Sequence, residues 1–284
     1  MQKLLDMFIL IRFVNCLLAM VGVVVGAMMT WLYPVYYGPM AAALAAFFVC
    51  AGGNVVNDIT DIESDRINHP NRVLVRGSIS VRSAMWLAAI LNLLALMSAA
   101  AVNEEVLVVV SVAIALLLGY NLKLKRIVLA GNFTVAALAG LTFMTGGWSV
   151  DSTLITTLPG PLIPAVFAFF FHLVREIVKD VQDIEGDRRS GRQSLPILIG
   201  ESRSLAVAMV LHLTLVILTL VPIWNRWFGR LYEILAVYVV ALPLLALLIL
   251  IWGKPSLRML RIGSSALKVG MVLGLVALLA ESFG

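Results

Sequence analysis

The chain has 284 residues, of which 61% are hydrophobic and only 13% are charged, and its mean hydropathy is +1.01. A soluble domain is about 45–50% apolar and about 25% charged, so this composition excludes an ordinary soluble protein and predicts an all-α integral membrane protein. The net charge of +5 indicates positively charged connections on one side of a membrane and attraction to anionic lipid. We expect no nucleic-acid partner.

Nine apolar windows are long enough, or nearly so, to cross the hydrocarbon core, which needs about 20 residues. The fourth window is rather short. The first is too long for the core of a signal peptide and lacks a small-residue cleavage site, so it is counted as a span. In chain order the windows are 8–31, 39–56, 82–102, 105–120, 127–147, 162–178, 205–224, 232–252 and 263–282.

The cationic residues predict the orientation of these spans. All but Arg226 and Arg230 of the 21 lysines and arginines fall on one side of a nine-span topology. Because positively charged connections stay in the cytoplasm, the N-terminus and the connections after the second, fourth, sixth and eighth spans are expected there. The chain is thus predicted to be a multi-pass protein of the cell membrane.

An acidic motif occurs twice in the chain. Residues 57–66 read NDITDIESDR and residues 179–188 read KDVQDIEGDR, and six of the ten positions are identical at an offset of 122. Each copy follows an even-numbered span. The duplication predicts one domain, 1–284, made of two parallel four-helix half-repeats, about 1–122 and 123–252, with a ninth helix at 263–282.

The spacing of the carboxylates predicts which of them act together. On a helix, positions i, i+3 and i+7 share one face. This places one stripe of three aspartates in each motif, with Asn57 beside the first stripe, whereas Glu63 and Glu185 point away from it toward surface pairing. Several carboxylates close together need cations, and Mg²⁺ prefers oxygen ligands and keeps positions open for substrate phosphates. The expected Mg²⁺ ligands are Asn57, Asp58, Asp61, Asp65, Asp180, Asp183 and Asp187.

Basic residues accompany both motifs and suggest that the ligand carries phosphate. Such residues, together with Mg²⁺, would stabilise the negative charge that develops on a leaving diphosphate. Tyr120 precedes two lysines in the equivalent connection of the first half, GYNLKLKR. The expected residues for the diphosphate, or for a phosphate on the acceptor, are Asn57, Arg66, Arg72, Lys123, Arg175 and Lys179.

With these motifs on a nine-helix plan, the chain resembles the UbiA superfamily of intramembrane prenyltransferases. The family pattern N-x-x-x-D-x-x-x-D matches Asn57, Asp61 and Asp65, and the second D-x-x-x-D matches Asp183 and Asp187. The Tyr–Lys motif between them matches Tyr120 with Lys123 or Lys125. The resemblance implies helices around a central cavity open to lipid, two Mg²⁺ ions, a prenyl diphosphate donor and a lipophilic acceptor. The implied catalytic residues are Asp61, Asp65, Tyr120, Lys125, Asp183 and Asp187.

Three stretches look most like the ether-lipid branch of this superfamily. They are DRINHPNRVLVRGSIS, GNFTVAALAGLTFMTGG and REIVKDVQDIEGDRRSGRQSLPILIG. This branch implies transfer of a geranylgeranyl group from geranylgeranyl diphosphate to the free hydroxyl of geranylgeranylglyceryl phosphate. Two alternatives stay open: prenylation of an aromatic acceptor, such as a quinone, haem or chlorophyll precursor, and an ion-coupled transporter.

Overall fold

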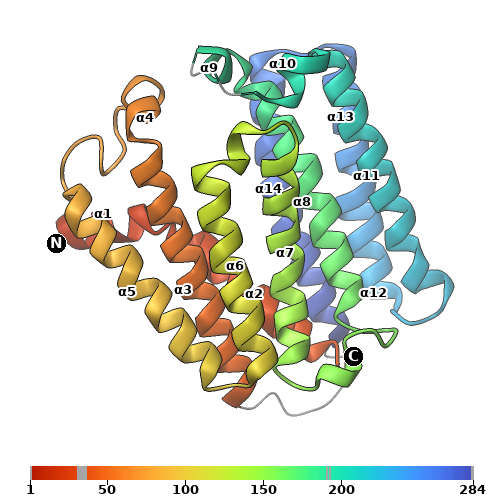
Figure 1. Ribbon diagram of the computed structural model, residues 1–284. Helices are drawn as coiled ribbons and strands as arrows, with labels where there is room; N and C mark the ends of the chain where they lie inside the picture. The colour runs from red at the N-terminus through yellow and green to blue at the C-terminus, as the bar shows by residue number, and fades with distance from the viewer. Residues whose placement is uncertain (1, 31–36, 190, 192, 283–284) are drawn as a thin grey trace. The chain divides into compact units, whose positions relative to one another are not determined.

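The regular structure of the described residues consists of helices only (Figure 1). The computed structural model describes residues 2–30, 37–189, 191 and 193–282. The chain divides into two compact units. Unit 1 comprises residues 1–124 and 141–155, and unit 2 comprises residues 125–140 and 156–284. These boundaries differ from the predicted half-repeats, 1–122 and 123–252, which remain a prediction.

Unit 1 is built around the long helix α3. Its apolar core joins residues of α2, α3 and α5 with the loop that follows α4, where Val73 and Leu74 are buried. Helix α3 packs against α2, α5 and α6. The helices of this unit are α1 (Gln2–Leu10), α2 (Phe13–Met28), α3 (Tyr37–Thr60), α4 (Ile62–Asn68), α5 (Val81–Ala100) and α6 (Glu104–Leu122).

The first predicted span is broken rather than continuous, and its predicted end at Trp31 lies outside the described residues. Helices α1 and α2 meet at an angle of 50°. Arg12, between them, has the left-handed backbone conformation, with φ 53° and ψ 58°. That conformation costs a non-glycine residue about 1–2 kcal/mol. The break also frees the carbonyl of Ile11, which accepts hydrogen bonds from Asn54 Nδ2 at 2.9 Å and from Cys16 Sγ at 3.1 Å. Contacts with α3 therefore stabilise a break that apolar periodicity does not reveal.

Glycines let two helices of unit 1 approach to backbone contact. A Cβ atom added to Gly146 would lie 2.0 Å from the carbonyl oxygen of Val23, and one added to Gly26 would lie 2.0 Å from that of Phe143. Both pairs join α2 to the end of α7 (Ala130–Trp148), which is part of unit 1 from Leu141 onward. Small residues at such crossings are typical of helix packing in membranes, where dispersion contacts replace the hydrophobic effect.

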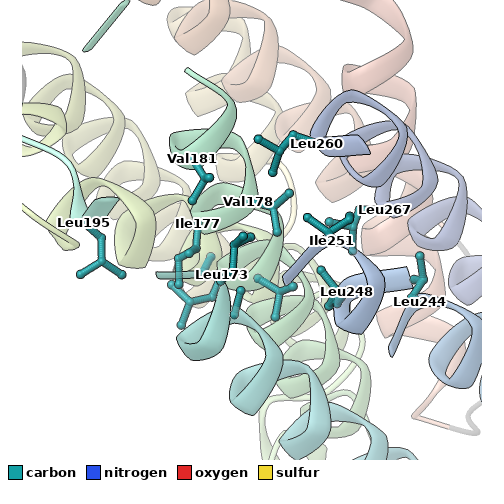
Figure 2. Close-up of a cluster of buried hydrophobic side chains, with 14 of the residues drawn as sticks. Leu173, Ile177, Val178, Val181, Leu195, Leu244, Leu248, Ile251, Leu260 and Leu267 are labelled. Atoms are coloured by element: carbon teal, nitrogen blue, oxygen red, sulfur yellow. The ribbon is translucent and has the colours of Figure 1, made fainter. Parts of the chain in front are cut away.

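Unit 2 is organised around α8 (Leu162–Gln182), which packs against α11 and α14. Figure 2 shows the core of this unit, in which Leu173, Ile177 and Val181 of α8 contribute to one cluster with residues of α13 and α14. The remaining elements are η1 (Leu124–Arg126), which begins at the boundary with unit 1, η2 (Ser152–Leu154) in unit 1, and in unit 2 α9 (Ile184–Arg189), α10 (Leu195–Ile199), α11 (Glu201–Trp224), α12 (Arg230–Tyr232), the π-helix η3 (Glu233–Ala241), α13 (Leu242–Gly253) and α14 (Leu257–Ser282).

Six helical stretches are long and apolar enough to cross a membrane, or seven if α1 and α2 form one broken span. They carry many exposed Leu, Ile, Val and Trp side chains, a surface that water would disfavour and lipid accommodates. The chain is therefore a multi-pass membrane protein. Helices α7 and α8 occupy the fifth and sixth predicted windows, but neither is among these six stretches. Helix α8 bears Arg175, Glu176, Lys179 and Asp180, which lower its hydropathy, and the count of nine spans stays a prediction.

Candidate functional site

Both acidic motifs interrupt their helix at the middle aspartate. Helix α3 ends at Thr60 and α4 starts at Ile62, whereas α8 ends at Gln182 and α9 starts at Ile184 (Figure 1). The dihedral angles of the two intervening residues are nearly equal: φ −101° and ψ 4° at Asp61, φ −98° and ψ 7° at Asp183. The predicted uninterrupted stripe is therefore a helix with a matched kink in each copy.

The kink leaves the first and third aspartates of each motif buried and the middle one partly exposed. Asp58 and Asp65 are buried in the first motif, as are Asp180 and Asp187 in the second. Glu63 and Glu185 are exposed, and Glu185 lies 3.7 Å from Arg188 in a surface ion pair. The predicted outward direction of both glutamates is confirmed.

In the first motif, two arginines hold the buried carboxylates. Asp58 Oδ1 accepts hydrogen bonds from Arg12 Nη2 and from Arg72 Nη1, each at 2.8 Å. The same Arg72 nitrogen lies 3.1 Å from Asp65 Oδ2. Asp58 and Asp65 are seven residues apart and share this guanidinium, so the structure brings them together as their helical spacing predicts.

Burial has an electrostatic consequence at Asp65. Removal from water raises the pKa of this carboxyl above its usual value, and the neighbouring charges of Asp61 and Asp58 act in the same direction. The Arg72 guanidinium opposes this rise in pKa. A carboxylate in such surroundings is stabilised by any additional cation that binds beside it.

In the second motif, an amide side chain bonds to the first aspartate. Asn132 of α7 donates a hydrogen bond from Nδ2 to Asp180 Oδ2 at 2.7 Å, and both side chains are buried. Asp180 is the residue equivalent to Asp58. In both units a polar side chain near the start of an earlier helix thus bonds to the first aspartate. Each of those helices follows a residue with positive φ, Arg12 (53°) before α2 and Leu129 (64°) before α7.

Sequence reasoning missed the role of Asn132, and it left open whether Asn54, one turn before Asp58, and Arg12 in the first span contribute to the site. Arg12 Nη1 donates to Asn54 Oδ1 at 3.2 Å, so the amide of Asn54 is bonded on both sides. Polar residues inside apolar windows at corresponding places, near the starts of the first and fifth spans, were the available signal. Their partners lie 42 to 48 positions away in the sequence, which no local pattern shows.

The bond between Asn132 and Asp180 leads to a prediction. Substitution of Asn132 by leucine should lower prenyl transfer by about 10- to 100-fold, because it leaves a buried carboxylate without its amide donor. Asn132→Asp should be at least as harmful, since it places a second carboxylate against the first. The measurement is turnover at saturating Mg²⁺, with thermal unfolding as the check on folding. Near-normal turnover in both variants would contradict a role in holding Asp180.

The other predicted basic and polar residues occupy different environments. Arg66, Lys123 and Lys179 are exposed, whereas Lys125, Tyr120 and Asn57 are half-buried. Of the two candidate lysines, Lys125 is therefore the less exposed. The Arg175 side chain is 20% exposed and pairs with the adjacent Glu176. The assignment of these residues to substrate remains a prediction.

The donor set of the first motif fits a hard cation. The Arg72 nitrogen already lies within hydrogen-bonding distance of two carboxylates, Asp58 and Asp65, so a positive charge is accommodated there. In the described part of the chain, no group of three or more His, Cys, Asp or Glu side chains is arranged to hold a metal ion.

Comparison with known sequences gives a consistent result. The profile of the UbiA prenyltransferase family matches residues 39–261. A digeranylgeranylglyceryl phosphate synthase from Methanopyrus kandleri is 36% identical over 273 residues, which cover 96% of this chain and 97% of the relative. A synthase of the same name from Methanosphaera stadtmanae is 30% identical over 268 residues, 94% and 96% of the two chains.

Solved structures agree with the sequence comparison. A structure described as a digeranylgeranylglyceryl phosphate synthase in membranes superposes with a TM-score of 0.80 at 32% identity, covering 99% of both chains. A UbiA homologue from Archaeoglobus fulgidus, bound to GPP and Mg²⁺, superposes with a TM-score of 0.64. Its identity to this chain is 20%, with 96% of this chain and 99% of that chain covered, so its likeness concerns the fold.

Proposed function

Because the chain belongs to the UbiA prenyltransferase family, we propose that it transfers a geranylgeranyl group from geranylgeranyl diphosphate to the free hydroxyl of geranylgeranylglyceryl phosphate. The product is a second ether bond on the glycerol of a membrane lipid. The transporter alternative is set aside, since the family is one of enzymes. The observation that carries the proposal is the end-to-end similarity to synthases of this name, at 36% and 30% identity.

The proposed reaction has three requirements that the protein must meet. It must hold the diphosphate, stabilise the charge that develops on it, and keep water away from the allylic cation. The bond from the first prenyl carbon to the diphosphate oxygen breaks, and its electron pair leaves with the diphosphate. The glycerol hydroxyl oxygen then forms the ether bond and loses its proton. Bound Mg²⁺ would supply positive charge to the leaving group.

The residues of this chain divide these tasks. Asn57, Asp61 and Asp65 would hold one Mg²⁺, and Asp183 and Asp187, with Asp180 beside them, would hold a second. Arg72, Arg175 and Lys125 would bind phosphate oxygens of donor or acceptor. The two guanidinium groups match phosphate geometry in a bidentate manner, and the lysine ammonium binds phosphate as a point charge. Apolar helices would provide the dry surroundings that protect the cation from water.

The proposal includes the finer architecture. Nine spans in two parallel half-repeats plus a ninth helix would place both acidic motifs at the cytoplasmic face of the cell membrane. A water-soluble diphosphate head group would reach the motifs from that side, while the prenyl chain stays in lipid. The positive charge of the connections supports this orientation.

The experiment incubates purified protein and Mg²⁺ with geranylgeranyl diphosphate and either geranylgeranylglyceryl phosphate or 4-hydroxybenzoate. Mass spectrometry identifies the prenylated product. We expect a doubly prenylated glyceryl phosphate and no prenylated ring. A prenylated ring would replace the lipid acceptor by an aromatic one, and the absence of diphosphate release with either acceptor would contradict the enzyme itself.

A further inference from the structure

Arg72 bridges two aspartates of the first acidic motif. Its Nη1 atom lies 2.8 Å from Asp58 Oδ1 and 3.1 Å from Asp65 Oδ2, so one cationic nitrogen joins the first and third aspartates. Both carboxylates are buried, and each would be strongly disfavoured as an ion without a positive partner. A positive charge thus lies between two of the carboxylates that are expected to bind Mg²⁺.

The loop that carries Arg72 is fixed on two sides. The next residues, Val73 and Leu74, are buried in the core of unit 1. Four residues after Arg72, Arg76 pairs with Asp6 of α1, a carboxylate that is only 1% exposed. Packing and an ion pair therefore hold the backbone of this loop in place, which leaves the long Arg72 side chain as the part able to move.

A second arginine fixes Asp58 from the other side. Arg12 binds Asp58 Oδ1 through Nη2 and Asn54 Oδ1 through Nη1, two acceptors one helical turn apart on α3. Arg12 has a left-handed backbone conformation, and such outliers persist when surrounding contacts determine them. Asp58 is consequently shared between a guanidinium at the kink of the first span and Arg72.

We propose that Arg12 and Arg72 are resident counter-cations of the first acidic motif, so that this motif takes up Mg²⁺ only together with a diphosphate. The proposal rests on the proposed function, in which this motif binds Mg²⁺ and the donor's diphosphate. Arg12 is a positioning residue that acts through Asp58, whereas Arg72 exchanges its carboxylate partners for phosphate oxygens when the two ligands arrive.

Elementary electrostatics supports this coupling. A divalent ion that approaches Asp65 alone meets a guanidinium already on the carboxylate, and the two positive charges repel each other. A diphosphate removes this conflict, because it offers the arginine a bidentate partner and gives the metal further oxygen ligands. Mg²⁺ commonly binds through one or two carboxylates and substrate phosphates rather than in an all-protein cage. Metal without substrate would then leave the motif in its arginine-bound form.

The test measures Mn²⁺ binding by electron paramagnetic resonance in the full-length protein, with the second motif disabled by Asp183→Asn and Asp187→Asn. In this background the Arg72→Met variant should bind Mn²⁺ at least about tenfold more tightly than the protein that keeps Arg72, because the substitution removes the repulsion between the guanidinium and the metal ion. Asp61→Asn added to Arg72→Met should abolish the gain. Persistence of the gain would place the new binding elsewhere and overturn the proposal.

Arg82→Met is the matched control. Arg82 is exposed at the start of α5, and its substitution removes the same charge outside the motif, so the Mn²⁺ affinity should change by less than about twofold, as screening at a distance predicts. An equal gain in this variant would indicate general electrostatics and contradict the proposal. So would Mn²⁺ binding that is equally tight with and without Arg72.

A second measurement does not depend on folding of the Arg72 variant. In equilibrium dialysis of the disabled-second-motif protein with Arg72 intact, added inorganic diphosphate should raise retained Mn²⁺ at least about tenfold, since the ligands bind as a pair. Retention of Mn²⁺ unchanged by diphosphate would overturn the coupling. The product assay on the unmodified protein tests the proposed reaction separately. If Mn²⁺ and diphosphate bind together but no lipid product forms, the proposed reaction is refuted and the coupled binding is not.

Discussion

Replacing Asp61 or Asp183 by alanine should abolish prenyl transfer, with a loss of at least about a thousandfold, because each removes a carboxylate expected to bind Mg²⁺ at the point where charge develops. Both aspartates sit at the kink of their motif, with matched backbone dihedral angles, and both side chains are partly exposed. Neither belongs to the buried core, so the variants should stay folded. Diphosphate release and product mass measure turnover, and thermal unfolding in detergent measures folding.

The neighbouring glutamates provide matched controls. Glu63 and Glu185 each lie two positions after the kink aspartate and are exposed. Glu63→Gln and Glu185→Gln should retain activity within about threefold, since a solvated surface carboxylate contributes little. A loss in Glu63→Gln as deep as that in Asp61→Ala would show that the assignment of faces is wrong. Near-normal rates in both alanine variants would refute the metal assignment.

Gly146→Leu should prevent unit 1 from folding properly. A Cβ atom at this position would lie 2.0 Å from the Val23 carbonyl oxygen and 2.6 Å from the Ala27 nitrogen. Backbone atoms cannot move aside as flexible side chains can, so α2 and α7 would have to separate. Overpacking a close contact costs typically about 1–3 kcal/mol, and overlap with backbone should reach or exceed the upper end of that range. The expected result is a large loss of membrane-inserted protein and of thermal stability.

Gly274→Leu is the control for this substitution. Gly274 lies in α14, and an added Cβ atom would meet nothing within 4 Å there. The same change should leave yield and unfolding temperature close to those of the unmodified protein, because glycine has low helix propensity and leucine a high one. Equal damage from both substitutions would mean that helix packing at Gly146 is not the cause.

The sequence by itself determined the membrane class, the places of the helices and the candidate site. A helix that crosses lipid needs about 20 mostly apolar residues, so the composition and the apolar windows are visible in the sequence itself. Duplication of the Asp motif at an offset of 122 is likewise visible without coordinates. Helical periodicity predicted that Glu63 and Glu185 face the surface, and both are exposed.

Only the tertiary structure decided what holds the motifs. Arg12 and Leu129 have positive φ angles, although neither is a glycine or an asparagine, the residues that usually signal this conformation. The sequence therefore did not predict the break in the first span. Asp58 is bound by Arg12 from 46 positions away, and Asp180 by Asn132 from 48. Such partners are selected by which helices pack together and at what rotation. That choice depends on the whole set of contacts along both helices, a free-energy balance that no local stretch of sequence contains.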